Sequence, residues 1–252
     1  TLCLDHPVVQ SLLPRIRRRT VTYGFNAQAD VRGENIRFDG ISAKVDVRWK
    51  GQPMGLLSLN MPGRHNVSNA LASVAVGLEL DIPFERIAKG LDGFSGVDRR
   101  FSVRAEVNVA DGKPVTIIDD YGHHPTEIRA TLQAAANAWT GERVIAVFQP
   151  HRYTRVRDLF DDFVRCFNHA TEVIVCPVYA AGEALIEGID HHRLAQGMIE
   201  HGHHGVSVVE DLDEATALLS KNRQPGDIII TLGAGDVNRV CTDLEAALNG
   251  HQ

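Results

Sequence analysis

A chain of 252 residues with 44% hydrophobic and 23% charged residues has the composition of a globular protein, long enough for one large domain or two ordinary ones. Its formal net charge of −6 excludes a general attraction for nucleic acid. The four cysteines form no C-x-x-C pair, so we expect reduced thiols rather than a disulfide framework. No apolar run can span a bilayer and no signal-peptide pattern is present, which predicts a cytoplasmic protein without a membrane partner.

The first part of the chain is rich in strand-like patterns. From about residue 21 to residue 59 apolar and polar residues alternate, as in I-S-A-K-V-D-V-R-W at 41–49, which predicts short antiparallel strands. Helical spacing then predicts a helix over 66–80 and a shorter one over 84–91, introduced by Pro83.

After Gly96 the pattern changes, and strand-like runs alternate with helical ones. The predicted strand and helix pairs are 115–119 with 125–139, 144–148 with 153–167, 172–178 with 191–201, 206–209 with 212–221, and 227–232 with 237–248. Such alternation predicts a mainly parallel, doubly wound α/β sheet with helices on both faces. We therefore expect two domains, residues 1–96 and 97–252.

Two acids end the first strand of the second part, in the run I-I-D-D-Y-G-H-H-P-T-E at 117–127. In a doubly wound sheet, ligands bind beyond the carboxyl ends of the strands. A carboxylate of Asp119 or Asp120 there can accept both hydroxyls of a ribose. The alternative is that the acids only cap a helix beginning at Pro125, with His123 and His124 on the surface.

The next strand runs into V-F-Q-P-H-R-Y-T-R at 147–155. Arg152 and Arg155 are three residues apart, so both guanidinium groups can project from the first turn of a helix. Cations normally prefer a helix C-terminus, and two of them at an N-terminus suit a carboxylate or phosphate ligand. The alternative is that both arginines pair with Asp158 or Asp161 on the surface.

A third candidate lies at the start of the helix predicted over 66–80. Asn66 and Asn69 are one turn apart, and an amide side chain both donates and accepts, as the edge of an adenine requires. Capping of the helix by Asn66 is the alternative.

Two weaker signals follow. The run I-I-I-T-L-G-A-G-D at 228–236 lacks the full G-x-G-x-x-G of a phosphate-binding turn. The histidines have no recognised ligand spacing, so we predict no metal site in this chain; they are His191, His192, His201, His203 and His204.

These motifs occur together in one order and at one spacing. They are G-R-H-N-x-x-N, D-R-R-F, D-D-Y-G-H-H-P-T-E-I, F-Q-P-H-R-Y-T-R, V-Y-A-A-G-E and L-G-A-G-D. Over essentially the whole chain the sequence resembles the Mur ligases of peptidoglycan synthesis, and among them the alanine-adding members.

The resemblance implies three domains in the complete enzyme: one for the UDP-sugar, a central ATPase with a P-loop, and a Rossmann-like C-terminal domain. Residues 1–96 would be the last part of the central ATPase domain, and residues 97–252 the C-terminal domain. No G-x-x-x-x-G-K-[ST] occurs in this sequence. We therefore expect an incomplete enzyme, inactive alone, whose partner is the missing N-terminal part carrying the ligands for Mg²⁺.

The implied reaction joins L-alanine to UDP-N-acetylmuramate at the expense of ATP, through an acyl phosphate, with Mg²⁺ stabilising the transferring phosphoryl group. Arg99 stands where relatives often have a histidine, so no separate role is assigned to it. By resemblance, Asn66 and Asn69 contact adenine, Asp120 the ribose and Arg100 the phosphates, while Tyr121, His123, His151, Arg152 and Arg155 surround the alanine; Arg100 and His123 are the catalytic candidates.

Two alternatives remain open. One is the related cell-wall recycling ligase, which attaches a ready-made murein peptide to the same sugar. The other is a free-standing Rossmann-like module that binds a nucleotide or an acidic metabolite and has no catalytic activity.

Overall fold

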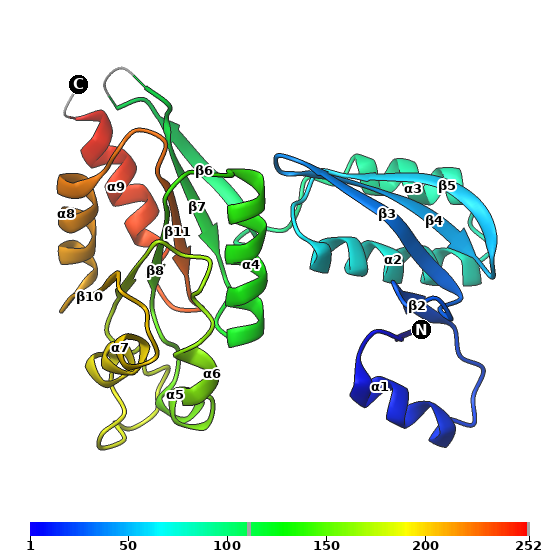
Figure 1. Ribbon diagram of the computed structural model, residues 1–252, viewed down its shortest axis with the longest axis horizontal. Helices are drawn as coiled ribbons and strands as arrows, with labels where there is room; N and C mark the ends of the chain where they lie inside the picture. The colour runs from blue at the N-terminus through cyan, green and yellow to red at the C-terminus, as the bar shows by residue number, and fades with distance from the viewer. Residues whose placement is uncertain (110–111, 251–252) are drawn as a thin grey trace. The chain divides into compact units, whose positions relative to one another are not determined.

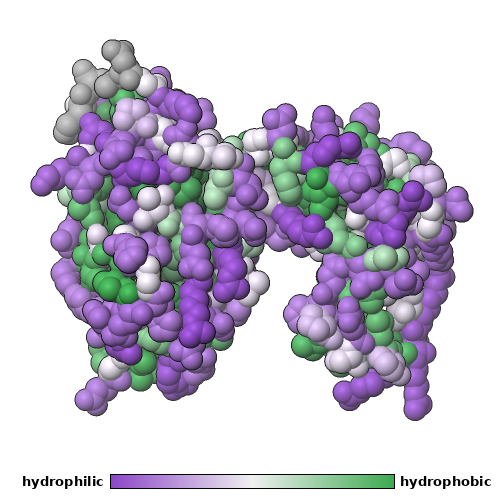
Figure 2. Space-filling view, in the orientation of Figure 1, coloured by the Kyte–Doolittle hydropathy of each residue, from purple (hydrophilic) through white to green (hydrophobic). Residues whose placement is uncertain are grey.

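In a computed structural model the chain forms two compact units, Thr1–Gly96 and Val97–Gln252, each built around its own β-sheet (Figure 1). The structure describes residues 1–109 and 112–250. None of the helices in these ranges combines the length and the apolar character that a membrane crossing needs. Figure 2 shows hydrophilic residues over most of the visible surface of both units, with hydrophobic residues in small patches.

The first unit is a five-stranded sheet with helices against it. Its elements are β1 (Leu2–Cys3), α1 (Pro7–Leu12), the 3₁₀ helix η1 (Leu13–Arg15), β2 (Thr22–Gly24), β3 (Val31–Asp39), β4 (Ser42–Trp49), β5 (Gln52–Leu59), α2 (Arg64–Glu79) and α3 (Phe84–Asp92). The order in the sheet is β1-β2-β3-β4-β5. Strands β3 to β5 are antiparallel as predicted, but β1 and β2, and likewise β2 and β3, pair in parallel.

The antiparallel prediction is therefore wrong at β2. The Asp30 carboxylate accepts hydrogen bonds from the Thr22 backbone N–H and hydroxyl, at 2.8 Å each, and this contact holds the connection between β2 and β3. The alternation of apolar and polar residues shows where a strand lies, but it says nothing about the direction of its neighbour.

The core of the first unit lies between the sheet and α2. Val67, Leu71 and Val74 recur at helical spacing on α2 and are fully buried. They pack with Val31 and Val45 of the sheet in one hydrophobic cluster. The helix thus covers one face of the sheet, as its apolar stripe predicts.

The second unit is a six-stranded sheet of the order β10-β9-β8-β11-β7-β6. Its elements are β6 (Ser102–Val107), β7 (Val115–Asp120), α4 (Pro125–Ala138), β8 (Val144–Phe148), α5 (Tyr153–Asp158), α6 (Phe160–Phe163), β9 (Glu172–Val175), α7 (His191–Glu200), β10 (Val206–Val208), α8 (Leu212–Asn222), β11 (Ile228–Leu232) and α9 (Arg239–Asn249). All strands except β6 run parallel, so the predicted doubly wound α/β class is confirmed.

Alternate residues of the central strand β11 face two separate cores. Ile228 and Ile230 pack in the cluster that contains Leu132 of α4, whereas Ile229 packs with Leu244 of α9. Successive side chains of a strand point to opposite faces, so helices on both faces bury the whole strand.

The strand order brings three strand ends together. The chain passes from β7 to β8 and on to β9 and β10, and then returns to place β11 between β7 and β8. Loops that leave neighbouring strands in different directions create a crevice at their carboxyl ends. The ends of β7, β8 and β11 belong to the runs at 117–127, 147–155 and 228–236 that were selected from the sequence. These three runs therefore lie at the same edge of the sheet.

Two features of the second unit differ from the prediction. Strand β6, antiparallel to β7, was not predicted, because most of its residues are exposed or half-buried and its apolar pattern is weak. The single helix predicted over 153–167 is two short helices instead. Leu159 leaves the helical conformation (φ −119°, ψ 22°) between α5 and α6.

A fragment of residues 97–252 is expected to fold by itself, since its own helices cover both faces of its sheet. In thermal melts followed by circular dichroism, the fragment should show one cooperative transition that coincides with a transition of the whole chain. A fragment without cooperative unfolding would contradict this expectation. Residues 1–96 should melt at a lower temperature.

Candidate active site

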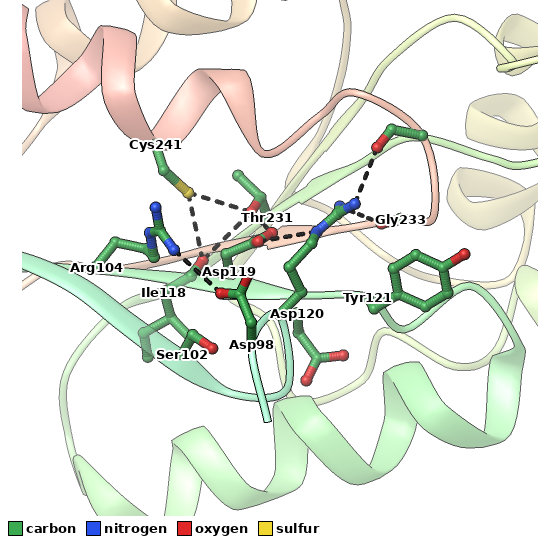
Figure 3. A network of polar contacts seen from close by, with 12 residues as sticks. Asp98, Ser102, Arg104, Ile118, Asp119, Asp120, Tyr121, Thr231, Gly233 and Cys241 are labelled. Carbon is green, nitrogen blue, oxygen red and sulfur yellow. Dashed lines mark hydrogen bonds and ion pairs between the residues drawn. The ribbon is translucent and has the colours of Figure 1, made fainter. Parts of the chain in front are cut away.

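A buried ion pair organises the strand ends of the second unit. The Asp119 carboxylate, 2% exposed, accepts a hydrogen bond from Arg99 Nε at 3.0 Å and from the Thr231 hydroxyl at 2.8 Å. The remaining Arg99 nitrogens donate to the carbonyl oxygens of Gly233 (2.8 Å) and Gly235 (3.2 Å). Figure 3 shows Asp119, Thr231 and Gly233 in one network. Asp119 therefore joins β7 to the loop after β11, and its oxygens already have protein partners.

Asp120, the predicted ribose ligand, is also buried. Its two oxygens accept hydrogen bonds from the backbone N–H groups of Phe101 (2.8 Å) and Gly122 (2.7 Å). Burial raises the pKa of Asp120 above the ordinary carboxyl value, although these two N–H groups and Arg100 act against the rise. A carboxylate oxygen can accept more than one hydrogen bond, so the present bonds leave acceptor capacity for a ligand hydroxyl.

The alternative in which Asp119 and Asp120 cap a helix is wrong. Helix α4 is capped by His124, whose ring accepts a hydrogen bond from Thr126 N–H at 3.2 Å. Glu127 completes the capping box by accepting from His124 N–H, at 3.3 Å.

Glu127 also binds to two residues near the start of α4. It accepts from His123 N–H at 3.1 Å and pairs with Arg100 at 3.3 Å. Burial by itself would raise the pKa of Glu127, but the hydrogen bond from His123 N–H and the charges of His123 and Arg100 bring it below the usual value. Glu127 is therefore an anion at neutral pH, and it holds Arg100 beside the Tyr121 ring, 5.6 Å from its centroid.

A row of aromatic and imidazole rings crosses the carboxyl ends of β7 and β8. The Tyr121 ring meets the His123 ring edge-on at 5.3 Å, and the His123 and His151 rings are 6.0 Å apart. His151 in turn stacks on Tyr179, at 5.5 Å and 8° between planes. The structure therefore brings Tyr121, His123 and His151 together, as the sequence predicted, and adds Tyr179.

The hydrogen bonds of the two imidazoles fix their tautomers. His123 Nδ1 lies 3.0 Å from the Tyr121 carbonyl oxygen, which only accepts, so Nδ1 donates and Nε2 is the acceptor whenever the ring is neutral. His151 Nδ1 lies 3.2 Å from Arg155 Nη1, which only donates, so Nδ1 accepts and Nε2 carries the proton. Burial lowers the pKa of His151, and the nearby Arg155, His123 and Arg152 lower it further.

Arg152 and Arg155 occupy different positions at the start of α5. Arg152 is the residue before the helix and has a φ of +71°, which is unusual for a side-chain-bearing residue and occurs often at functional sites. Its N–H donates to the Tyr179 carbonyl at 2.9 Å. Arg155, one turn later, also donates to the His151 carbonyl oxygen, at 3.2 Å.

The alternative in which these arginines pair with surface acids is not supported. Asp158 pairs with Arg157, at 2.7 Å, and neither Arg152 nor Arg155 forms an ion pair among the described residues. The start of α5 is capped by a different acid. Glu183 accepts from the N–H and hydroxyl of Thr154, at 3.0 and 2.7 Å, which explains the glutamate of V-Y-A-A-G-E.

Asn66 and Asn69 belong to helix α2 of the first unit. Asn66 is the third residue of α2, and its side chain donates to the Pro62 carbonyl oxygen at 2.8 Å. The residue before the helix is Gly63, with φ +91°, so the capping alternative for Asn66 is wrong. Asn69 is exposed on the next turn.

Sequence reasoning missed the residues that pack against the ring cluster and hold it in position. Gln149 is 5% exposed and donates to Asp236 at 2.8 Å. A Cβ on Gly235 would lie 2.3 Å from Gln149 Oε1 and 2.7 Å from the Tyr179 ring, so only glycine fits there. One feature of the sequence could have indicated these residues: Gln149, Tyr179 and the G-A-G run each follow a strand. Each segment taken alone resembles an ordinary loop, so they were not selected from the sequence as supporting residues.

Arg99→Met should lower the free energy of unfolding by about 3–5 kcal/mol, because it leaves the Asp119 carboxylate buried without its cation. The matched control is Arg104→Met. Arg104 is 45% exposed and pairs at 3.3 Å with Asp98, which is 79% exposed, so its loss should cost less than about 1 kcal/mol. If urea unfolding shows the same loss of unfolding free energy in both variants, the Arg99–Asp119 pair stabilises the fold no more than an exposed ion pair does.

Comparison with known proteins identifies relatives of this chain. The curated UDP-N-acetylmuramate–L-alanine ligase of Sorangium cellulosum (strain So ce56) is 49% identical over 249 residues, which are 98% of this chain and 52% of that protein. The crystal structure of UDP-N-acetylmuramate–alanine ligase from Thermotoga maritima has a TM-score of 0.77 at 27% identity, covering 92% of this chain and 48% of that one. A murein peptide ligase from Psychrobacter arcticus 273-4 has a TM-score of 0.60 at 21% identity, covering 90% and 45%, a likeness that shows the fold alone.

The chain spans about half the length of the curated relatives it matches. The description "Mur ligase middle domain" matches residues 2–77, and the description "Mur ligase, glutamate ligase domain" matches residues 99–235, more than half of the chain. With its doubly wound second unit and the residues gathered at the ends of β7, β8 and β11, the chain belongs to the Mur ligase family.

Proposed function

We propose that this chain carries the amino-acid site and part of the nucleotide site of an ATP-dependent ligation that joins L-alanine to UDP-N-acetylmuramate. The support is the 49% identity to a curated ligase of that name over 98% of the chain. The observation that carries the proposal is the cluster at the ends of β7 and β8. There the His123 ring, whose Nδ1 bonds the Tyr121 carbonyl oxygen, lies 6.0 Å from the His151 ring, which in turn contacts the Arg155 guanidinium group. Neither Arg152 nor Arg155 forms an ion pair among the described residues.

The amino-acid half of the reaction needs two functions that this cluster supplies. Arg155 and Arg152 hold the alanine carboxylate through charge-assisted hydrogen bonds. The alanine ammonium must lose a proton before its nitrogen can attack. Nε2 of His123 accepts it, because Nδ1 is already the donor to the Tyr121 carbonyl oxygen. The free amine then attacks the carbonyl carbon of the sugar's acyl phosphate, an amide bond forms and inorganic phosphate leaves.

Each unit by itself contains candidate residues for the nucleotide. In the second unit, Asp120 offers its remaining acceptor capacity to the ribose hydroxyls, and Arg100, 43% exposed, is available to the phosphates. In the first unit, Asn66 and Asn69 are the adenine candidates. Tyr121 and His151 form the remaining wall of the alanine site.

Mg²⁺, when bound, would neutralise charge on the transferring phosphoryl group. It prefers an octahedral set of oxygen ligands. Over residues 1–109 and 112–250, the one group of three or more potential ligand side chains lies elsewhere, at His191, His192 and Glu210. That another part of the complete enzyme supplies the ligands for Mg²⁺ is our proposal from the resemblance to the Mur ligases.

The choice between L-alanine and a murein peptide is an open alternative, since a murein peptide ligase shares the fold. The sequence relatives favour L-alanine, because all eight that lead the comparison bear the alanine ligase name. A module without catalytic activity would bind ADP but show no amino-acid-dependent release of phosphate. Assays on the protein as its gene encodes it, which offer L-alanine or a murein tripeptide with UDP-N-acetylmuramate and ATP, distinguish the three.

Asp120→Asn should raise the KM for ATP about tenfold to a hundredfold and leave the KM for L-alanine nearly unchanged. A hydrogen bond to a charged group contributes about 1.5–3 kcal/mol, which corresponds to that factor. The kinetics are measured on the protein as its gene encodes it, and the melting temperature identifies any loss caused by the two backbone bonds of Asp120. An unchanged KM for ATP would remove Asp120 from the nucleotide site.

Arg152→Lys and Arg155→Lys should each raise the KM for L-alanine, about tenfold or more, with little effect on ATP. Lysine keeps the charge but cannot form the two parallel hydrogen bonds of a guanidinium group with a carboxylate. Arg157→Lys is the matched control, because Arg157 lies on the same helix and pairs with Asp158 instead. If all three variants use alanine equally well, the pair is ordinary surface charge.

A further inference from the structure

Two histidines and a glutamate meet at the edge of the second unit, in a place that the proposed ligation does not use. His191 and His192 are the first two residues of α7, and Glu210 follows β10 by two residues. The ligand atoms of the three side chains all lie within 4.8 Å of one another. Strand β10 is at the far end of the sheet from β7, so this group is distinct from the Tyr121–His151 row.

His191 has a buried nitrogen without a hydrogen-bond partner. Its side chain is 12% exposed, and Nε2 makes no hydrogen bond although it is inaccessible to solvent. A buried nitrogen without a hydrogen-bond partner is unusual in a folded protein, and a bound ion is one explanation for it.

The spacing of the group suits a tetrahedral ion. With zinc–nitrogen and zinc–oxygen bonds of about 2.0–2.2 Å, neighbouring ligand atoms of a tetrahedral site are about 3.3 Å apart. In the structure, His192 Nε2 lies 3.2 Å from Glu210 Oε1, and His191 Nε2 lies 4.0 Å from Glu210 Oε2. His192 and Glu210 are 55% and 70% exposed, which leaves room for a water molecule as the fourth ligand.

The helix dipole and the nearby carboxylates also affect whether a metal ion can bind here. The positive end of the α7 dipole disfavours protonated imidazole at the first turn, and neutral imidazole is the form that binds a metal. The same dipole opposes a bound cation. The carboxylates of Glu210 and of Asp190, the N-cap residue that accepts from Arg193 N–H at 2.7 Å, supply the compensating negative charge.

Contrary to the prediction from histidine spacing, which could not include Glu210, we propose that His191, His192 and Glu210 form a site for Zn²⁺ or a similar divalent transition metal ion. Two imidazoles and one carboxylate favour Zn²⁺ over Mg²⁺, which prefers oxygen ligands. The ion ties the start of α7 to the segment that follows β10. Its role is to hold the edge of the sheet, because a ligand that binds only the folded state stabilises that state.

The test uses the whole chain and Co²⁺ as a spectroscopic substitute for Zn²⁺, followed by competition with Zn²⁺. The wild-type chain should bind one equivalent with the visible absorption of tetrahedral Co²⁺, and Zn²⁺ should raise its melting temperature. His191→Ala, His192→Ala and Glu210→Gln should each weaken binding at least about tenfold, the lower bound known for residues that merely support metal ligands.

His204→Ala is the matched control, since His204 is exposed and lies beyond the opposite end of α7. It should bind Co²⁺ as the wild type does, which separates this site from ions held by the other histidines. His192→Ala and Glu210→Gln change exposed side chains, so they test the proposal even if His191→Ala fails to fold. The absence of a stoichiometric tetrahedral complex, or equal affinity in wild type and both exposed variants, would overturn the proposal.

Discussion

The candidate site depends on one buried interaction, the ion pair between Arg99 and Asp119. An uncompensated carboxylate at 2% exposure is very unfavourable, so Asp119 requires a cation that is itself held in place. Arg99 meets this need because its other nitrogens bind the carbonyl oxygens of Gly233 and Gly235. The pair thereby joins the residue before Asp120 to the loop after β11, and these are two of the three strand ends around the crevice.

The third strand end is positioned from the same loop. Gly235 leaves space for Gln149 and for the Tyr179 ring, and the Tyr179 ring supports His151 by stacking. Residues without any expected contact to a ligand thus help to position His151. The Tyr121 carbonyl oxygen and the Arg155 guanidinium group give His123 and His151 opposite tautomers, so one neutral ring can accept a proton at Nε2 while the other donates from Nε2.

Part of the site could be predicted from the sequence because ligands of a doubly wound sheet bind beyond the carboxyl ends of its strands. Asp120, Tyr121 and His123 follow one predicted strand, and His151 and Arg155 follow the next. Parallel strands in a doubly wound sheet have their carboxyl ends at one edge, so nearness follows from topology. The break at Leu159 and the edge strand β6 escaped prediction, since neither changes the apolar pattern enough.

The sequence by itself determined the α/β class of the second unit, the membership of the motifs in one family, and the set of residues at the strand ends. Only the tertiary structure decided which acid of the pair Asp119 and Asp120 is committed to Arg99, and which nitrogen of each imidazole is free. Local pattern reports burial and periodicity within one segment. Hydrogen bonds such as Arg99 to Gly235 join residues more than a hundred positions apart, and no local pattern contains them.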